Sequence, residues 1–244
     1  MSDLTGQTCV VTGATSGIGR GLAVAFAAKG ARVWAVSRTR ERLEALAAEA
    51  ESLPGEVVPV VADLESENDV HEVSRRLLAR SEGLDVLIHS AGAIELGSLE
   101  IARGDDFDRL YRVNLRAPFL LTQDLLGALR QARGQVVFIN SSAGLRASSL
   151  NVLYAATKHG LKAIADGLRD EVNADGIRVI SVYPGRTATA MQQFVHEHEG
   201  REYHPELLLQ PNDVVDVVLD ALAMPASGEI TDVSVRPMAK LGPS

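Results

Sequence analysis

Cysteine and aromatic residues are scarce in this sequence of 244 residues. A single cysteine, Cys9, lies inside an apolar run, and Phe, Trp and Tyr together supply only 4% of the residues. One cysteine cannot form a disulfide or a cysteine-based metal site within one chain. We therefore expect Cys9 to lie in the core, and we expect that core to be mainly aliphatic because 46% of the residues are hydrophobic.

An excess of positive charge and a long apolar run are absent as well. Lys and Arg number 24 against 32 Asp and Glu, which gives a formal net charge of −8. This balance disfavours nucleic acids and anionic membranes as partners. No stretch reaches the roughly 18 apolar residues of a membrane span, and residues 1–7 are polar rather than a targeting signal. The expectation is a soluble, cytoplasmic protein.

Short apolar runs recur along the chain and alternate with segments of helical length. Runs that are apolar throughout are typical of strands buried on both faces of a parallel sheet. The sequence therefore predicts an α/β fold of the Rossmann type, a doubly wound parallel sheet of about seven strands with helices on both faces. No linker or repeat divides it, so we expect one domain over residues 1–244. The expected strands are Thr8–Val11, Ala31–Val36, Val57–Ala62, Leu84–His89, Gln135–Asn140, Ile177–Tyr183 and Glu229–Val235.

The stretch 186–210 breaks this alternation because it is long, polar and without a strong period. Long loops inside compact domains are usually functional lids or disordered, and we expect a substrate lid here. His196, His198 and the neighbouring glutamates are residue types that can bind a metal ion. No pair of histidines at i,i+4 spacing supports a closed metal site here. We predict a solvated lid and no metal. The expected helices lie outside this stretch, at Gly17–Lys29, Arg38–Glu51, Asn114–Arg130, Asn151–Asn173 and Val214–Met224.

A glycine-rich turn joins the first expected strand to the first expected helix. Glycine tolerates positive φ and a close backbone approach to a ligand, and a helix N-terminus offers free N–H groups and partial positive charge to a pyrophosphate. The alternative is a turn in which glycine serves only tight packing. Its position at the first strand-to-helix junction favours dinucleotide binding. The cofactor-binding residues expected in this turn are Gly13, Thr15, Ser16, Gly17, Ile18 and Gly19.

The end of the second expected strand indicates which nicotinamide cofactor is bound. An acidic residue there would bind the ribose 2′-hydroxyl of NAD(H), but Val36 is followed by Ser37 and Arg38. A hydroxyl and a guanidinium suit a 2′-phosphate. Arg38 and Arg40 could instead be solvated charges at a helix start, yet the missing acid still disfavours NAD(H). We expect NADP(H).

Tyr154 and Lys158 are four residues apart in a segment of helical period, so both project from one helical face. A phenol titrates near pH 10 in water, and a nearby ammonium favours the phenolate, which brings the group closer to acid–base work at neutral pH. Ser141 ends an expected strand at the carboxyl edge of the sheet, where ligands of such sheets bind. Its hydroxyl could hold a carbonyl oxygen, with the adjacent Ser142 as the rival.

Together these motifs resemble the short-chain dehydrogenase/reductase family over about residues 8–223. The resemblance implies a hydride transfer between NADP(H) and a carbonyl or alcohol substrate. The matching positions, in order, are the turn Thr12–Gly19, Asp63, Ala91-Gly92, Asn114, Ser141, Tyr154, Lys158 and Pro184-Gly185.

The resemblance also implies a role for each matching residue. Tyr154 would be the general acid/base, Lys158 would bind the nicotinamide ribose and lower the tyrosine pKa, and Ser141 would position the substrate oxygen. Asn114 would complete a proton relay. The family serine stands thirteen residues before the tyrosine, which selects Ser141 over Ser142. Besides the turn, the implied cofactor-binding residues are Ser37, Arg38, Asp63 at the adenine amino group, Leu64, Ala91, Gly92, Tyr154, Lys158, Pro184, Gly185, Thr187 and Thr189 at the carboxamide.

Two features depart from the family pattern, and catalysis is expected to survive both. Where the family usually has Asn-Asn-Ala-Gly, this chain has His89 and Ser90 before Ala91-Gly92. The glycine-rich ending that family members frequently have after the last strand is also missing from this chain. Three functions stay open: an oxidoreductase of carbonyls and secondary alcohols, which is favoured, a non-catalytic cofactor-binding regulator, and a reductase of enoyl or imine bonds. Family members commonly form homodimers or homotetramers, so a homo-oligomer is expected.

Overall fold

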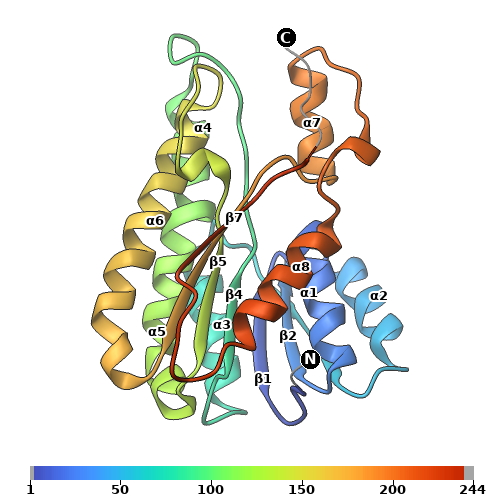
Figure 1. Cartoon of the computed structure of the whole chain (residues 1–244), viewed down its shortest axis with the longest axis vertical. Helices are drawn as coiled ribbons and strands as arrows, with labels where there is room; N and C mark the ends of the chain where they lie inside the picture. Colours follow the sequence, from blue (N-terminus) through green and yellow to red (C-terminus); the bar gives the residue numbers. More distant parts are fainter. Residues whose placement is uncertain (1–2, 239–244) are drawn as a thin grey trace.

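A single parallel sheet organises the structure. The computed structural model describes residues 3–238, and within them seven strands pair in parallel in the order β3-β2-β1-β4-β5-β6-β7 (Figure 1). This order and the helices on both faces confirm the predicted doubly wound Rossmann-type fold. The strands are β1 (Thr8–Thr12), β2 (Arg32–Ser37), β3 (Glu56–Val61), β4 (Val86–His89), β5 (Gln135–Ile139), β6 (Arg178–Pro184) and β7 (Asp232–Val235).

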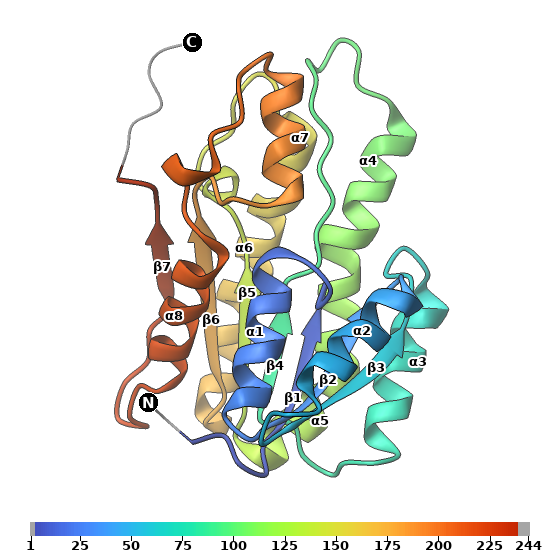
Figure 2. The same ribbon diagram turned by 90° about the vertical axis from the view of Figure 1, so that its right-hand side faces the viewer.

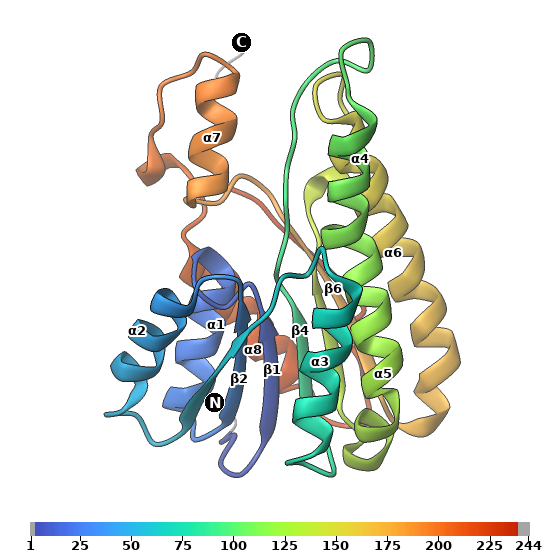
Figure 3. The same cartoon turned by 180° about the vertical axis from the view of Figure 1, so that it is seen from behind.

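Helices cover the sheet in two layers. Figure 2 looks onto the face covered by α1, α2 and α8, and Figure 3 shows α3, α5 and α6 on the opposite face. Among residues 3–238, no helix is both long enough and apolar enough to cross a membrane. The helices are α1 (Gly17–Ala28), α2 (Arg40–Ala50), α3 (Glu67–Leu78), α4 (Gly104–Tyr111), α5 (Ala117–Ala132), α6 (Val152–Val172), α7 (Ala190–His198) and α8 (Pro211–Leu222).

The apolar strands bury both of their faces, as their composition predicts. In β1, Cys9 and Val11 join the core cluster beneath α1 and α8, whereas Val10 between them joins the cluster beneath α3 and α5. Successive side chains of a strand point to opposite faces, so a strand between two helical layers must be apolar at every position. Cys9 is fully buried, as expected, and burial raises the pKa of its thiol.

The strand order reverses direction at β1. From β1 the chain first builds outward through β2 and β3, and it then returns to place β4 on the other side of β1. The loops that follow β1 and β4 therefore diverge at the carboxyl edge of the sheet, where open α/β sheets bind their ligands. The glycine-rich turn and the segment after β4 both start at this point.

The stretch 186–210 contains more structure than its composition suggested. Nine of its residues form α7, which begins after Thr189, whose hydroxyl accepts a hydrogen bond from the Gln192 N–H at 3.3 Å. An ion pair between Arg186 and Glu199 at 2.7 Å joins the two ends of the helical segment. The period was hidden because most positions of α7 are polar. A lid motion of this segment stays a prediction.

Close backbone contact fixes the turn between β1 and α1. A Cβ atom at Gly19 would lie 2.4 Å from the carbonyl oxygen of Gly13, and a Cβ atom at Gly13 would lie 2.8 Å from Cα of Ala91. Backbone atoms cannot move aside as a flexible side chain can. Glycine at these positions lets α1 start directly against the turn and lets the turn pack against the segment after β4.

The Gly19 contact predicts a loss of stability on substitution. We expect Gly19→Ala to lower the free energy of unfolding by about 1–3 kcal/mol, the usual cost of overpacking. The control is Gly167→Ala in α6, where nothing lies within 4 Å of the added Cβ; it should raise stability by about 0.5–1 kcal/mol because helical glycine is entropically unfavourable. Urea unfolding of both variants checks this, and a Gly19→Ala protein as stable as the Gly167→Ala protein would contradict it.

Candidate active site

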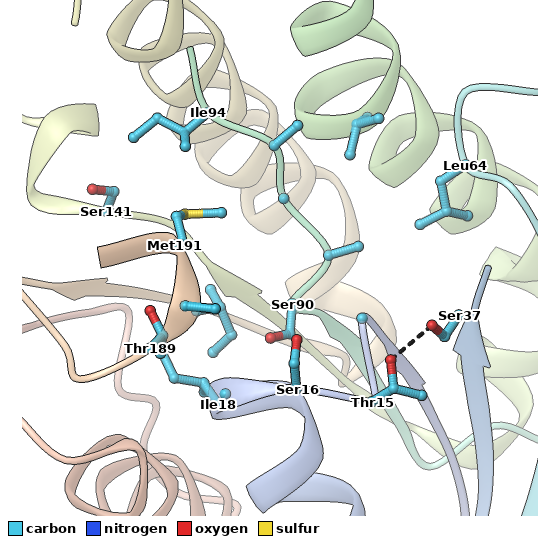
Figure 4. A pocket seen from close by; sticks show the side chains of 18 of the residues that line it. Thr15, Ser16, Ile18, Ser37, Leu64, Ser90, Ile94, Ser141, Thr189 and Met191 are labelled. Atoms are coloured by element: carbon cyan, nitrogen blue, oxygen red, sulfur yellow. Dashed lines mark hydrogen bonds between the residues drawn. The ribbon is translucent and has the colours of Figure 1, made fainter. Parts of the chain in front are cut away.

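A cavity of about 390 Å³ opens at the carboxyl edge of the sheet, over the point where the strand order reverses (Figure 4). It collects eighteen of the twenty residues that the sequence proposed as a site. The two that do not line it are Gly19, which packs against Gly13, and Asn114, which lies behind the wall. The eighteen are Gly13, Thr15, Ser16, Gly17, Ile18, Ser37, Arg38, Asp63, Leu64, Ala91, Gly92, Ser141, Tyr154, Lys158, Pro184, Gly185, Thr187 and Thr189.

The glycine-rich turn forms a cradle with unpartnered donors. Gly13 and Gly17 have φ values of +67° and +51°, in the left-handed region that favours glycine. No side chain caps the N-terminus of α1, although its N-cap residue is Ser16, and the first turn contains no acidic residue. The free N–H groups and the positive end of the helix dipole therefore face the cavity. This arrangement fits the pyrophosphate of a dinucleotide.

The end of β2 is polar and basic. Ser37 and Thr15 share a hydrogen bond of 2.8 Å between their hydroxyls (Figure 4). Arg38 is mostly exposed and lies 3.7 Å from the carboxylate of Glu65, which follows β3. Arg42, on the first turn of α2, lines the same end of the cavity. Sequence analysis missed Arg42 and Glu65, although the spacing of Arg42, four residues after Arg38, was a usable signal.

The residues after β3 partly hold their own turn. A carboxylate oxygen of Asp63 accepts a hydrogen bond from the Glu65 N–H at 3.1 Å, and the Asp63 N–H donates to Asp69 at 2.8 Å. Leu64 lies beside them on the cavity wall. The loop therefore presents a carboxylate and an apolar side chain in a fixed position at one end of the cavity.

Of the two residues that depart from the family pattern, only Ser90 faces the cavity. His89 is buried beneath α5, where Nε2 lies 2.8 Å from the Thr122 hydroxyl and the ring stacks on Phe138 at 4.9 Å. Burial lowers the pKa of His89 to about 3, so its imidazole is neutral. The Ser90 and Ala91 N–H groups both donate to the Thr12 hydroxyl at 3.1 Å. This pair of bonds joins the segment after β4 to the end of β1.

Tyr154 and Lys158 lie together on α6, as their spacing predicts. Both side chains are buried in the cavity wall, and Lys158 Nζ lies 5.8 Å from the centre of the Tyr154 ring. The ammonium donates a hydrogen bond of 3.1 Å to the carbonyl of Ile139, the last residue of β5. Ser141 follows two residues later, and its hydroxyl accepts from the Ala143 N–H at 3.1 Å.

Burial controls the ionisation of these groups. It raises the pKa of the Tyr154 phenol, while a hydrogen bond with Ser141 acts in the opposite direction. Burial thus outweighs the lowering of this pKa that the family resemblance implies for Lys158. Burial also lowers the pKa of Lys158 to about 8. At neutral pH the site therefore presents a phenol and an ammonium.

Asn114 lies in a π-helical turn, Arg112–Arg116, between α4 and α5. It is fully buried, and its amide makes three hydrogen bonds: it accepts from the Ala93 N–H at 2.8 Å and donates to the Ala93 carbonyl at 2.9 Å and the Thr157 hydroxyl at 3.1 Å. The side chain thus fastens the segment after β4 to α6. Single π-turns inside helices occur frequently at functional sites.

Asn140 is a second buried amide that sequence analysis missed, although it precedes Ser141. Its Nδ2 donates to the backbone carbonyl of Lys158 at 3.1 Å, and its backbone N–H donates to Val182 on β6 at 2.8 Å. Asn140 therefore ties the end of β5 to the helix that carries Tyr154. Other lining residues that the predicted set lacked are Val36, Thr39, Ala62, Ala93, Ile94, Arg109, Val113, Ile139, Ala190, Met191, Gln192 and Val195.

Pro184, Gly185, Thr187 and Thr189 form the remaining wall, at the end of β6. The Thr187 hydroxyl donates to the Gly185 carbonyl at 3.1 Å, and Thr189 caps α7. A Cβ atom at Gly17 would lie 3.0 Å from Cγ2 of Thr189, so this wall stands directly opposite the glycine-rich turn.

Comparison with known proteins gives matches over nearly the whole chain. The family model described as short chain dehydrogenase matches residues 7–200. The human protein named dehydrogenase/reductase SDR family member 11 is 30% identical, with 95% of this chain and 94% of the human protein covered. An uncharacterised oxidoreductase of Staphylococcus aureus strain USA300 is also 30% identical, over 98% of this chain and 100% of that protein.

Solved structures match to a similar extent. The crystal structure of a metagenomic short-chain oxidoreductase in complex with NADP has a TM-score of 0.84 and 30% identity, with 98% of this chain and 100% of that chain covered. A short chain dehydrogenase from Burkholderia cenocepacia J2315 in complex with NADP has a TM-score of 0.84 and 28% identity, with 96% and 98% covered.

Burial of the Lys158 ammonium is expected to lower the free energy of unfolding of the protein. The pKa of Lys158 is lowered from 10.5 to about 8. Between these values the folded protein holds fewer protons than the unfolded chain, so the Lys158 contribution to the free energy of unfolding rises with pH. Below pH 8 both states are protonated, and the full cost of burying the charge is present. We expect Lys158→Met to raise stability at pH 7 by about 1–3 kcal/mol.

That gain should shrink as the pH rises from 8 to 10.5, and urea unfolding across this range measures it. Lys162→Met is the control, because Lys162 lies one turn further along α6 and pairs with Asp166 at 2.6 Å. It should give no gain at any pH. A Lys158→Met protein that is less stable than wild type at pH 7 would show that the ammonium is not a net cost.

Proposed function

Because this chain belongs to the short-chain dehydrogenase/reductase family, we propose that it is an NADP(H)-dependent oxidoreductase that acts on a carbonyl or secondary alcohol. One observation carries the proposal: Ser141, Tyr154 and Lys158 line one cavity together with the glycine-rich turn and the basic end of β2. The site thus combines polar groups for a substrate oxygen with a cradle for a dinucleotide. NADPH supplies a hydride when it is bound, and NADP⁺ accepts one in the reverse direction.

Tyr154 is the proposed general acid/base. Its raised pKa keeps the phenol protonated at neutral pH, which is the form that donates a proton to the oxygen of a carbonyl as that oxygen becomes an alkoxide. In the oxidative direction the phenolate takes the proton from the alcohol. Because Tyr154 rests as a protonated phenol, reduction of the carbonyl can proceed without a prior loss of its proton, and this favours the reductive direction.

Ser141, Lys158 and Asn114 support this proton transfer. The Ser141 hydroxyl lines the same cavity as the phenol and would hold the same substrate oxygen. Lys158 would bind the nicotinamide ribose, and its positive charge beside the Tyr154 ring stabilises the phenolate. Asn114 holds the backbone of Ala93 against α6, and we assign it the proton relay that the family resemblance implies.

The basic end of β2 supports NADP(H) over NAD(H). Arg38 and Arg42 line the cavity beside the Ser37 hydroxyl, where a 2′-phosphate would find two guanidinium groups. Similar proteins from a metagenome and from Burkholderia cenocepacia are in complex with NADP. The Glu65 carboxylate lies 3.7 Å from Arg38 and offsets part of the positive charge at this end of the cavity.

Two wider expectations belong to the same proposal. The whole chain acts as one domain in which the segment 186–210 closes over the cavity as a lid, since Met191 and Val195 of α7 line the wall. Copies of the chain associate into a homodimer or homotetramer through α4 and α5, where Phe107, Tyr111 and Phe119 are exposed.

Arg38 provides a test of the cofactor. Arg38→Asp should lower kcat/KM for NADPH and raise it for NADH, so that the ratio of the two falls at least about 100-fold, because a carboxylate repels the 2′-phosphate and accepts the ribose 2′-hydroxyl. The control is Arg40→Asp, which makes the same charge change at an exposed residue that does not line the cavity. If the wild-type protein used NADH as well as NADPH, the residues at the end of β2 would not set a preference for NADP(H).

Tyr154 provides a test of the chemistry. Tyr154→Phe should leave thermal unfolding and NADPH affinity nearly unchanged and lower kcat by roughly 100- to 10,000-fold, the usual scale for the loss of a general acid. Tyr183→Phe serves as the control, because Tyr183 is also buried, bonds to Asp232 at 2.9 Å and does not line the cavity.

NADPH consumption is followed spectrophotometrically against matched panels of carbonyl, imine and enoyl compounds. Turnover of carbonyls that is lost in Tyr154→Phe supports the proposal. Turnover confined to imines or enoyl compounds would assign the site to a different reductase, and cofactor binding without any turnover would make the protein a regulator.

A further inference from the structure

The end of the cavity that holds Ser141 has apolar walls. Ile94 comes from the segment after β4, and Met191 and Val195 lie one turn apart on α7. Figure 4 shows Ile94 and Met191 toward the Ser141 side, whereas Ser37 and Leu64 lie at the far side.

These apolar side chains reach the proposed catalytic groups. A Cβ atom at Gly92 would lie 3.9 Å from the Met191 methyl and 4.0 Å from Lys158 Nζ, so the methionine and the ammonium approach the same point. Ile94 packs against the buried cluster that contains Tyr154 and Leu110. A substituent on a carbonyl held at Tyr154 would therefore meet hydrocarbon on both sides.

Apolar side chains also stay exposed on the segments that adjoin this end. Leu145 and Leu150 lie between β5 and α6, and Phe194 lies on α7 between Met191 and Val195; their exposed fractions are 48%, 44% and 42%. These three side chains add exposed apolar groups to two segments that also contribute residues to the cavity wall.

Charged residues are unequally distributed along the cavity. Arg38, Arg42, Asp63 and Glu65 follow β2 and β3, at the end assigned to the adenosine half. Lys158 is buried and bonded to the Ile139 carbonyl.

Within residues 3–238, Arg109 of α4 is the one remaining charged residue of the lining, and it forms an ion pair with Glu95. Only Arg109 of this pair lines the cavity; Glu95, which follows Ile94 in the chain, lines a separate small pocket. Gln192 also lines the cavity, and its side-chain amide lies 3.1 Å from Nδ1 of His196.

A carboxylate on the substrate would thus enter a site whose guanidinium is already paired. Burying an ionised group without a counter-charge is costly, and the positive charge of Arg109 is already balanced by Glu95. We propose that the substrate is an uncharged carbonyl compound with apolar substituents, selected by Ile94, Met191 and Val195 and by the Arg109–Glu95 ion pair. This inference rests on the proposed function and names the substrate class of the same site.

The test compares pairs of substrates that differ only in charge. para-Methylbenzaldehyde is paired with para-formylbenzoate, and para-methylacetophenone with para-acetylbenzoate, because a methyl and a carboxylate occupy the same position. For the wild-type protein with NADPH, kcat/KM should be at least about 100-fold higher for the uncharged member of each pair.

A single substitution should reduce that selectivity. Glu95→Gln removes the partner of Arg109 with little change of shape, so the ratio of kcat/KM for the carboxylate to that for its uncharged partner should rise about 10-fold. The matched control is Glu100→Gln, an exposed acid on the same segment for which the described part of the chain shows no ion pair. Its ratio should equal that of the wild type. The ratio within a pair cancels effects common to both substrates, and thermal unfolding confirms that both variants are folded.

The outcomes separate this inference from the function beneath it. A wild-type protein that reduces both members of each pair equally well, or prefers the carboxylates, overturns the substrate class and leaves the oxidoreductase intact. An unchanged ratio in Glu95→Gln overturns the role of the ion pair. Binding of NADPH with no reduction of any member overturns the proposed function, and the inference falls with it.

Discussion

The buried ammonium of Lys158 is the constraint on which the site depends. A charge buried in the cavity wall is unfavourable, and within residues 3–238 the Lys158 ammonium has one hydrogen-bond acceptor, the carbonyl of Ile139. That bond holds α6 against the end of β5, where Asn140 makes a second connection through the Lys158 backbone. The same ammonium lies over the Tyr154 ring. The group that costs stability thus also sets the distance between the strand end and the proposed acid.

The reversal of strand order at β1 places the other parts of the candidate site around the Lys158 ammonium. The cradle follows β1, the segment with Ala93 follows β4, and Ser141 follows β5, so three neighbouring strand ends supply three parts of one cavity. Buried amides and hydroxyls then lock these loops together: Thr12 binds the backbone after β4, and Asn114 binds Ala93. The residues proposed to bind cofactor and substrate therefore lie on loops joined by these hydrogen bonds, whereas α7 follows a separate segment after β6.

Most of the sheet could be predicted because buried parallel strands are apolar at every position, and β1 with Val10 and Val11 is an example. The site positions followed from motif order. The helix α7 was not predicted, since five of its nine residues are polar and conceal the helical period. For α4, the spacing of Phe107, Leu110 and Tyr111 was a usable signal. Glu65 and Arg109 could not be placed in the cavity, because their positions depend on how segments that follow different strands pack together. Spacing along a helix does not reveal burial either, and burial raises the pKa of Tyr154 in the folded protein.

The central claim is that hydride passes between a nicotinamide and a carbonyl carbon in this cavity. The most direct measurement uses NADPH that carries two deuterium atoms at the nicotinamide C4 position, with an accepted carbonyl in ordinary water, and mass spectrometry of the alcohol product. We expect one deuterium on the carbinol carbon and none on the hydroxyl, whose proton comes through Tyr154 from solvent. An alcohol without deuterium, or cofactor consumption without alcohol, would contradict it.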